Sequence, residues 1–481
     1  MTTEQGEGGL EPTAAEAVGD TPRRVASRAA IYTAGSAAPA IASLVVIPLI
    51  TRLLSQGEYD VVALGTVVIQ VGVILVALGM GAAITREYIL GEAGARGARG
   101  LVLQSALISV VIAAAALALG PVWGPAVLGR PWDAALALSI VASLGGGVVI
   151  VVQAYLRGAE RPVPFVLLAA GGTLVGPAIG LLVVLLGEPT ATAYLAALAA
   201  GYVASAVAGI GVTVASGPRD ASWRDLLRAL RLGVPTVPHQ IAIYVAIAGL
   251  VVVADRVLDA GGTANIVLTL GAGATVLTGA LNNAWAPLIY KEPAATRHAR
   301  LTSTTRVILR VVGALVAAVC LAAPLLVQLA SPPSYDHAAM IPAVVLASLS
   351  AVASVYYLAS SHLILVRGRT GVLSVSTPTA VGLGILAAAL TAPVWGLAAV
   401  GAAYAVIYVL LALLTTCAQV VLVDRPWRPP LAPVTLAVTL ACAVAAVVLP
   451  TSTGWWTVVR AVVALVAATA LLAPLRSALR R

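Results

Sequence analysis

Residues 101–120, LVLQSALISVVIAAAALALG, contain no charged side chain over twenty positions. A helix of this length rises about 30 Å, which matches the hydrocarbon core of a bilayer. The segment before this run holds three arginines, Arg86, Arg96 and Arg99, whereas the segment after it holds only Arg130. An uncharged run with unequal flanking charge predicts a transmembrane helix with a defined orientation.

The same pattern recurs along the whole chain. The composition is 60% apolar and 10% charged with a mean hydropathy of +1.02, whereas soluble domains carry about 25% charged residues. We therefore expect an all-α polytopic membrane protein with about fourteen transmembrane helices. The predicted spans are 30–50, 61–84, 101–120, 134–156, 164–187, 191–215, 232–254, 264–290, 307–329, 338–365, 371–391, 395–422, 431–450 and 455–474.

Positive charge alternates between the gaps that separate these runs. Of the 28 Lys and Arg residues, 24 fall in the N-terminal segment and every second gap after it, which we call the inner side. Subtracting the acids gives 24 − 12 = +12 inside and 4 − 7 = −3 outside. This asymmetry predicts a multi-pass protein with both termini in the cytoplasm. Anionic lipid then accounts for the basic charge, so no nucleic-acid partner is needed. The arginine-rich composition favours a bacterial plasma membrane.

The chain also contains a candidate internal repeat. Arg52-x4-Gly57 follows the first span and Arg256-x4-Gly261 follows the seventh. Helical hairpins of similar length also give such spacing by chance, but we favour two six-helix lobes in parallel orientation, as in many transporters. The predicted parts are a disordered cytoplasmic tail over 1–28, lobes over 29–218 and 219–424, and two appended helices with a short C-terminus over 425–481.

Several kinds of chemistry are missing from the sequence. The only lysine, Lys291, follows Tyr290 rather than a glycine, so there is no Walker A loop. The four histidines show no metal-ligand spacing, and the outer gaps are too short for a catalytic domain. We therefore expect a protein that is not an enzyme and that uses no metal or cofactor.

Four arginines lie on the outer side. Arg52 and Arg256 occupy equivalent positions in the repeat, where they either extend to the membrane interface or attract an anionic group such as a diphosphate to a central cavity. Arg130 and Arg460 are interpreted as interfacial anchors because they lie near tryptophan or proline residues at span ends. Asp255 directly precedes Arg256, but adjacent residues of a helix do not face each other.

A second polar group lies deeper in the predicted helices. It comprises His239, Gln240, Asn282 and Asn283, which share one depth, together with Gln70 and Gln153 in the first lobe. These side chains either form hydrogen bonds between helices or provide a polar patch for sugar hydroxyls, with His239 as a protonatable group. Both interpretations stay open at this point.

Several segments resemble a known family. They are PLITRLLSQGEY (48–59), GMGAAITR (79–86), GVPTVPHQIAIY (233–244), ADRVL (254–258) and WAPLIY (285–290). These runs resemble the polysaccharide-biosynthesis or O-antigen-type lipid-linked oligosaccharide flippases of the multidrug/oligosaccharidyl-lipid/polysaccharide (MOP) exporter superfamily. The resemblance spans about residues 25–425 and places Arg52, Arg86, Asp255 and Arg256 at the motif positions.

The resemblance implies that the two lobes are arranged in a V, and it also implies a substrate and a mechanism. Such a protein moves an undecaprenyl-diphosphate-linked oligosaccharide from the inner to the outer leaflet by alternating access, alongside partners such as a polysaccharide polymerase and glycosyltransferases. One alternative is a cation-coupled drug antiporter of the same superfamily, which usually needs a carboxylate at mid-membrane. Another alternative is a non-transporting scaffold of a polysaccharide synthase complex.

Overall fold

The computed structural model describes residues 42–369, 371–422, 426–451 and 454–479, and no strand occurs among them. Twelve of the described helices are long and apolar enough to span a membrane, and two shorter apolar helices, Ala42–Leu53 and Pro433–Val448, lie in the first and thirteenth predicted spans. The prediction of an all-α polytopic membrane protein is therefore confirmed. The predicted tail over 1–28 and the start of the first span lie outside the described residues.

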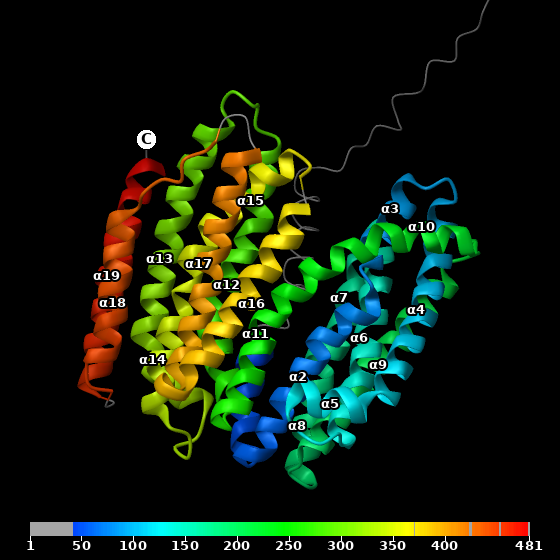
Figure 1. The fold of residues 1–481 in the computed structure, drawn as a ribbon, viewed down its shortest axis with the longest axis horizontal. Coiled ribbons are helices and arrows are strands. Elements are labelled where there is room, and N and C mark those ends of the chain that lie inside the picture. The colour runs from blue at the N-terminus through cyan, green and yellow to red at the C-terminus, as the bar shows by residue number, and fades with distance from the viewer. Residues whose placement is uncertain (1–41, 370, 423–425, 452–453, 480–481) are drawn as a thin grey trace, which may run out of the picture.

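Two bundles and an appended pair of helices make up the fold (Figure 1). After the helix Ala42–Leu53, the first bundle contains α2 (Gln56–Ala77), α3 (Met80–Leu90), α4 (Gly94–Ala118), α5 (Gly120–Leu128), α6 (Ala134–Gly158), α7 (Pro162–Ala170), the π-helical turn η1 (Gly171–Val175), α8 (Gly176–Leu186) and α9 (Ala191–Ala215). The second contains α11 (Val237–Leu258), α12 (Gly261–Tyr290), α13 (Arg297–Ala330), α14 (His337–Ser348), α15 (Ser350–Val366), α16 (Gly371–Trp395) and α17 (Leu397–Leu422). The connection between them is α10 (Trp223–Gly233) and the short 3-10 turn η2 (Val234–Thr236).

The appended pair consists of α18 (Pro433–Val448) and α19 (Trp455–Leu479). These helices pack on α13 through a small apolar cluster that includes Leu321, Cys442 and Ala467. Arg460 is buried there and donates hydrogen bonds to the carbonyls of Ala446, Leu449 and Pro450, at the end of α18. The positive side chain thus stabilises the carbonyl end of a helix.

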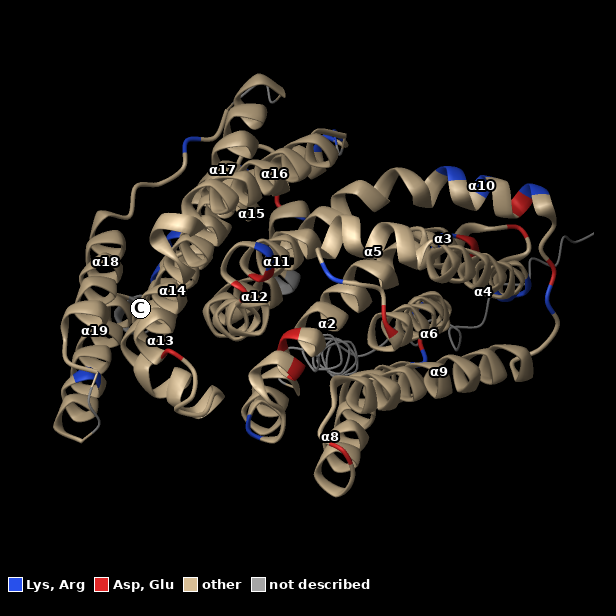
Figure 2. Cartoon of the chain, turned by 60° about the horizontal axis from the view of Figure 1, so that its bottom comes forward, with Lys and Arg blue, Asp and Glu red and all other residues tan. Residues whose placement is uncertain are grey.

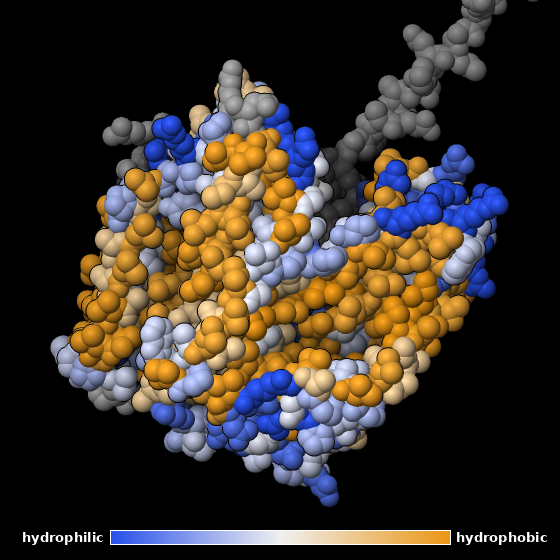
Figure 3. Space-filling model, viewed as in Figure 1, coloured by the Kyte–Doolittle hydropathy of each residue, from blue (hydrophilic) through white to orange (hydrophobic). Residues whose placement is uncertain are grey.

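The distribution of apolar residues on the surface indicates where the protein contacts lipid. Space-filling Figure 3 shows a wide apolar belt with hydrophilic residues gathered toward the two ends of the molecule. Figure 2 shows long stretches of helix that carry no charged residue. Exposed apolar side chains are costly in water, so a belt of this extent indicates contact with lipid.

The two bundles approach each other at one end of the molecule and diverge at the other (Figure 1). We call the end near Arg52 and Arg256 the closed end. The opposite end carries α3 and α10 and most of the arginines, and we call it the open end. The closed end is joined by direct contacts between the bundles, which are described below.

Two interrupted helices meet beside the divergent region. Between α2 and α3, Leu78 and Gly79 both have positive φ, at 48° and 66°. Between α10 and α11, Pro235 interrupts the helical hydrogen bonds because it has no N–H. A Cβ on Gly79 would lie 2.4 Å from the carbonyl oxygen of Gly233. Only glycine permits both the left-handed conformation and this close backbone contact.

Candidate substrate cleft

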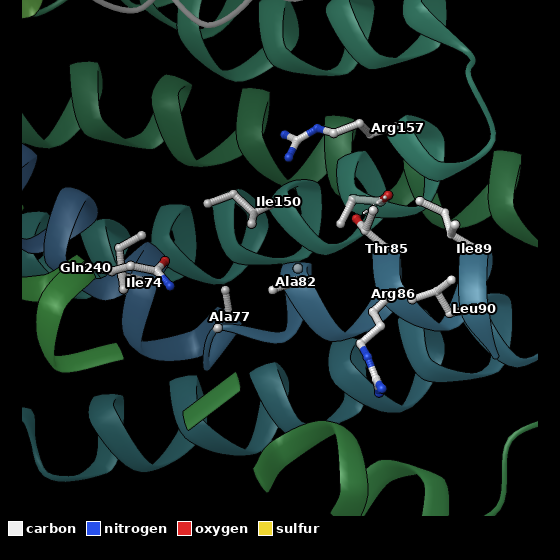
Figure 4. A pocket seen from close by; sticks show the side chains of 13 residues that line it. Ile74, Ala77, Ala82, Thr85, Arg86, Ile89, Leu90, Ile150, Arg157 and Gln240 are labelled. Carbon is white, nitrogen blue, oxygen red and sulfur yellow. Dashed lines mark hydrogen bonds between the residues drawn. The ribbon is translucent and has the colours of Figure 1, made fainter. Parts of the chain in front are cut away.

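A cleft of about 520 Å³ lies next to the two interrupted helices. Residues of α2, α3 and α6 form its walls, and Gln240 of α11 reaches it from the second bundle (Figure 4). Arg86 and Arg157 line its arginine-rich part, toward the open end. The first bundle therefore forms most of the cleft, and Gln240 is the contribution of the second bundle.

The two arginines give the cleft its positive charge. Arg86 comes from α3 and Arg157 from the last turn of α6, and Figure 4 shows them on different sides of the pocket. The guanidinium carbon of Arg157 lies 5.5 Å from the centre of the Phe165 ring, in a cation–π contact. No carboxylate of the described residues forms an ion pair with either arginine. The charge is thus available to an anionic ligand.

Neutral polar groups complete the lining. The Gln240 amide donates to the Thr236 hydroxyl at 2.8 Å, and the Thr85 hydroxyl donates to the carbonyl of Ala154 at 3.0 Å. These contacts fix the two side chains at the cleft wall. They leave the amide oxygen of Gln240 as an acceptor for hydroxyl or N–H groups.

Arg52 lies at the closed end, outside the cleft. Its guanidinium donates to the carbonyl of Leu329 at 2.9 Å and to the carbonyl of Gln328 at 3.1 Å, near the end of α13. The neighbouring Thr51 hydroxyl donates to the carbonyl of Ala330 at 2.8 Å. The end of the first helix therefore binds the carbonyl end of α13 in the second bundle through these hydrogen bonds.

Arg256 makes the corresponding contact in the opposite direction. It donates to the carbonyls of Pro125 and Ala126 at the end of α5 in the first bundle. The preceding Asp255 is buried and forms a bidentate pair with Arg130, at 2.8 and 3.0 Å. This hydrogen-bonded carboxylate raises the pKa of the Arg130 guanidinium. The interpretation of Arg130 as an interfacial anchor missed this partner.

These contacts follow the candidate repeat. Each lobe's first helix ends in a residue pair, 51–52 or 255–256, that binds the end of a helix in the other bundle. An arginine at a helix C-terminus is stabilised by the free carbonyls and by the helix dipole. We call Arg52 and Arg256 with their carbonyl partners the two arginine clasps. Together they hold the closed end.

The remaining predicted residues lie at different places. The His239 ring is hydrogen-bonded to the Thr377 hydroxyl at 3.0 Å, which links α11 to α16. The Gln153 amide donates to the carbonyl of Phe165 at 3.0 Å inside the first bundle. The side-chain oxygen of Asn282 is buried and has no partner among the described residues.

The last two predicted site residues are Asn283 and Gln70. Asn283 is on α12, but its side chain is outside the described set. Gln70 lines a second, smaller pocket. Of the predicted set, the structure thus brings Arg86 and Gln240 to the cleft and gathers Arg52, Asp255 and Arg256 at the closed end.

Arg157 was not singled out in the sequence as a site residue, because its charge already had another explanation. It is one of the 24 inner-side positive residues, and membrane topology already explains all of these. Within residues 42–369, 371–422, 426–451 and 454–479, no group of three or more His, Cys, Asp or Glu side chains is arranged to hold a metal ion.

The fold and the cleft define a multi-pass, all-helical membrane protein with a positively charged cleft. The family model described as polysaccharide biosynthesis protein matches residues 25–291, more than half of the chain. The chain therefore belongs to the polysaccharide biosynthesis protein family. No curated protein matches the sequence significantly.

Solved structures support the same fold at low sequence identity. A lipid II flippase, MurJ, in an inward closed conformation has a TM-score of 0.71 and 11% identity, over 95% of this chain and 100% of that one. An inward-facing multidrug resistance MATE transporter of the MOP superfamily has a TM-score of 0.62 and 17% identity, over 77% of this chain and 92% of that one. A MOP superfamily transporter from Pyrococcus furiosus has a TM-score of 0.58 and 15% identity, over 82% of this chain and 94% of that one.

Proposed function

We propose that this protein moves a lipid-linked oligosaccharide, carried on undecaprenyl diphosphate, from the inner to the outer leaflet of a bacterial plasma membrane. The observation that carries the proposal is the cleft at the open end, where Arg86 and Arg157 carry positive charge without a carboxylate partner among the described residues. A diphosphate needs such charge, and guanidinium groups bind phosphate oxygens in a bidentate manner. The family supports a role in polysaccharide biosynthesis.

The three parts of such a substrate call for three environments. The diphosphate lies between Arg86 and Arg157, and the polyprenyl chain stays in lipid between the bundles. The glycan extends along the cleft past Gln240 toward the closed end. Each part is thereby matched to a charged, an apolar or a neutral polar surface.

Transport then requires the bundles to exchange which end is open. Substrate enters at the open end, which by the positive-inside rule faces the cytoplasm. The arginine clasps release, the bundles close behind the diphosphate, and the substrate leaves on the other side. Each clasp involves only hydrogen bonds to carbonyls, whereas the Arg130–Asp255 ion pair also joins the bundles at this end and must separate when it opens.

This role is a transport step without covalent chemistry. The proposed location is the plasma membrane with both termini in the cytoplasm, where the glycosyltransferases that build the glycan work. A polysaccharide polymerase on the other side is the proposed recipient of the product. Membrane lipids surround the apolar belt.

A drug antiporter of the same superfamily is the second candidate. The observation that favours it is Asp60, a buried carboxylate in α2 that accepts the N–H of Gly262 at 2.6 Å and forms no ion pair among the described residues. Asp60 lies near the start of α2 rather than at the middle of the span, but it is buried. If the antiporter assignment holds, a pH gradient will drive drug uptake into proteoliposomes and Asp60→Asn will abolish it.

Gene deletion separates these functions. We expect a deletion strain to accumulate a lipid-linked sugar on the cytoplasmic leaflet, and the wild-type gene to clear it. Altered drug sensitivity without an accumulated intermediate would select the antiporter. A strain rescued fully by a variant lacking Arg86 and Arg157 would instead favour a scaffold role.

A further inference from the structure

A second pocket of about 200 Å³ lies deeper in the molecule than the cleft, toward the closed end. Its walls come from the helix Ala42–Leu53, α2, η1, α8, α9 and α12, so both bundles contribute. Its polar lining includes Tyr59, Gln70, Tyr194, Tyr202, Asn265 and Thr269. We call it the tyrosine pocket.

Most of these polar groups have no partner in the protein. The side chains of Gln70, Tyr194, Tyr202 and Thr269 form no hydrogen bond with another described residue. By contrast, the Asn265 amide donates to the Tyr59 hydroxyl at 3.3 Å and thereby connects the two bundles. Polar groups in such a site are normally satisfied by solvent or by a ligand.

The described lining contains no Asp, Glu, Lys, Arg or His. A cation would lack a carboxylate, and a phosphate or uronate would lack a basic partner. A purely apolar ligand would leave amide and hydroxyl groups unpaired, which is unfavourable. The chemistry that fits is an uncharged molecule rich in hydroxyl groups, with an apolar face for the tyrosine rings.

The wall at η1 is shaped for this purpose. Gly172 and Thr173 lie in the π-helical turn and line the pocket. A Cβ on Gly172 would lie 2.4 Å from ring atoms of Tyr202, so glycine lets the ring lie against the helix. Single π-helical turns occur frequently at functional sites because they re-aim groups within an otherwise regular helix.

The tyrosine pocket and the cleft lie along the same helix, α2. Gln70 lines the former and Ile74, one helical turn further along α2, lines the latter. Residues four apart share a face of a helix. One face of α2 therefore connects the two pockets, and the distance along it from Gln70 to Ala77 is about 10 Å.

We infer that the tyrosine pocket binds an uncharged sugar residue of the lipid-linked substrate while the diphosphate is held at Arg86 and Arg157. The inference rests on the proposed function and specifies the substrate further: the sugar seated here is neutral. Because Asn265 and Thr269 belong to the second bundle, separation of the bundles at the closed end uncovers the pocket. Sugar release is thus coupled to opening of that end.

Binding to the purified full-length protein in lipid nanodiscs tests this assignment. The probes are undecaprenyl diphosphate alone, the same lipid carrying a neutral glucose oligosaccharide, and the same lipid carrying an oligosaccharide of glucuronic acid. We expect glucose to tighten binding about tenfold relative to the bare lipid and glucuronic acid to give no gain. The double variant Gln70→Leu with Tyr202→Phe removes two hydrogen-bonding groups, at about threefold each, and abolishes the glucose gain.

Control variants distinguish binding in the tyrosine pocket from binding in the charged cleft. The double variant binds bare undecaprenyl diphosphate as the wild type does, whereas removal of Arg86 and Arg157 weakens all three lipids. Tyr408→Phe removes a hydroxyl from α17, outside the tyrosine pocket, and preserves the glucose gain. A glucose gain that survives in the Gln70/Tyr202 variant, or an equal gain from glucuronic acid, overturns the inference.

A phosphate-free probe distinguishes this failure from failure of the proposed function. Polyprenyl glucoside has no diphosphate, so its binding reports the pocket alone and should fall at least fivefold in the Gln70/Tyr202 variant. Binding of bare undecaprenyl diphosphate that does not depend on Arg86 and Arg157 would contradict the proposed function. Glucoside binding that ignores both substitutions would contradict the pocket.

Discussion

Removal of both arginine clasps should shift the protein toward a state that is open at the closed end. In the variant Arg52→Ala with Arg256→Ala, four hydrogen bonds from guanidinium groups to carbonyls between the bundles are lost, two at each clasp. Bonds from charged groups contribute about 1.5–3 kcal/mol each when shielded. Both arginines are exposed, so solvent reduces the stabilisation to about 1 kcal/mol per clasp.

The expected population change follows from that sum. About 2 kcal/mol corresponds to a shift of about thirtyfold in the equilibrium between the two states. A state populated at about 1% in the wild type would rise to about a quarter of the molecules. A change of that size is measurable by spectroscopy.

Distances between spin labels report this population directly. Glu188, in the loop before α9, and Ser334, in the loop before α14, are exposed and belong to different bundles. With Cys417 replaced by alanine because it is exposed, Glu188→Cys and Ser334→Cys provide the two labelling sites. The clasp variant should show an added longer-distance component in double electron–electron resonance.

The control and the refuting result are clear. Arg219→Ala removes an exposed arginine at the open end and should leave the distance distribution unchanged. A clasp variant with the wild-type distribution would show that these hydrogen bonds do not set the conformational equilibrium. The account of the closed end would then be wrong.

Three further predictions concern the cleft, an ion pair and the interrupted helices. Replacing Arg86 and Arg157 together by alanine should weaken undecaprenyl diphosphate binding at least tenfold in a nanodisc titration. Lysine at both positions should restore only part of the affinity, because lysine keeps the charge but lacks the bidentate fork of arginine. Arg130→Ala leaves its buried carboxylate partner unpaired and should lower the stability of the protein by about 2–4 kcal/mol. The measurement is a drop in Tm, and a second substitution that neutralises the carboxylate should partly reverse it. Gly79→Ala introduces a Cβ that meets a backbone carbonyl and should lower both Tm and transport, whereas Gly57→Ala meets no atom within 4 Å and should leave both unchanged.

Sequence alone was sufficient for the membrane fold. Uncharged runs long enough to cross a bilayer are a strong signal because backbone hydrogen bonds in lipid must be satisfied within helices. The helix interruption at Pro235 was also foreseeable, since proline lacks an N–H. The break after α2 was harder to find: Leu78 adopts a left-handed conformation that no propensity rule predicts for leucine.

The site was only partly accessible from sequence. Arg86 was identified by its motif and Gln240 by its depth in a helix, and both line the cleft. Arg52 and Arg256 were expected either to extend to the membrane interface or to attract an anionic group, and in this conformation the carbonyl ends of helices in the opposite bundle bind them. Which distant carbonyls face an arginine depends on the state of the transporter, and a linear pattern does not contain that information.

The tyrosine pocket was hidden for a different reason. Tyrosines near span ends are common in membrane proteins as interfacial residues, so Tyr59 carries no separate signal in the sequence. Tyr202 lies in the middle of α9, with no motif around it. Their meaning comes from the helix packing, which places them around one cavity with Gln70 and Asn265. The pocket is therefore a property of the fold rather than of any motif.

The most direct test of the central claim is transport of a defined substrate by the purified protein. Proteoliposomes are loaded in the open-end leaflet with fluorescent undecaprenyl diphosphate carrying a neutral oligosaccharide, and its arrival in the opposite leaflet is followed by a membrane-impermeant quencher. We predict protein-dependent translocation that falls at least tenfold when Arg86 and Arg157 are replaced by alanine. Translocation at the rate of protein-free liposomes, or at an unchanged rate in that variant, would contradict the account.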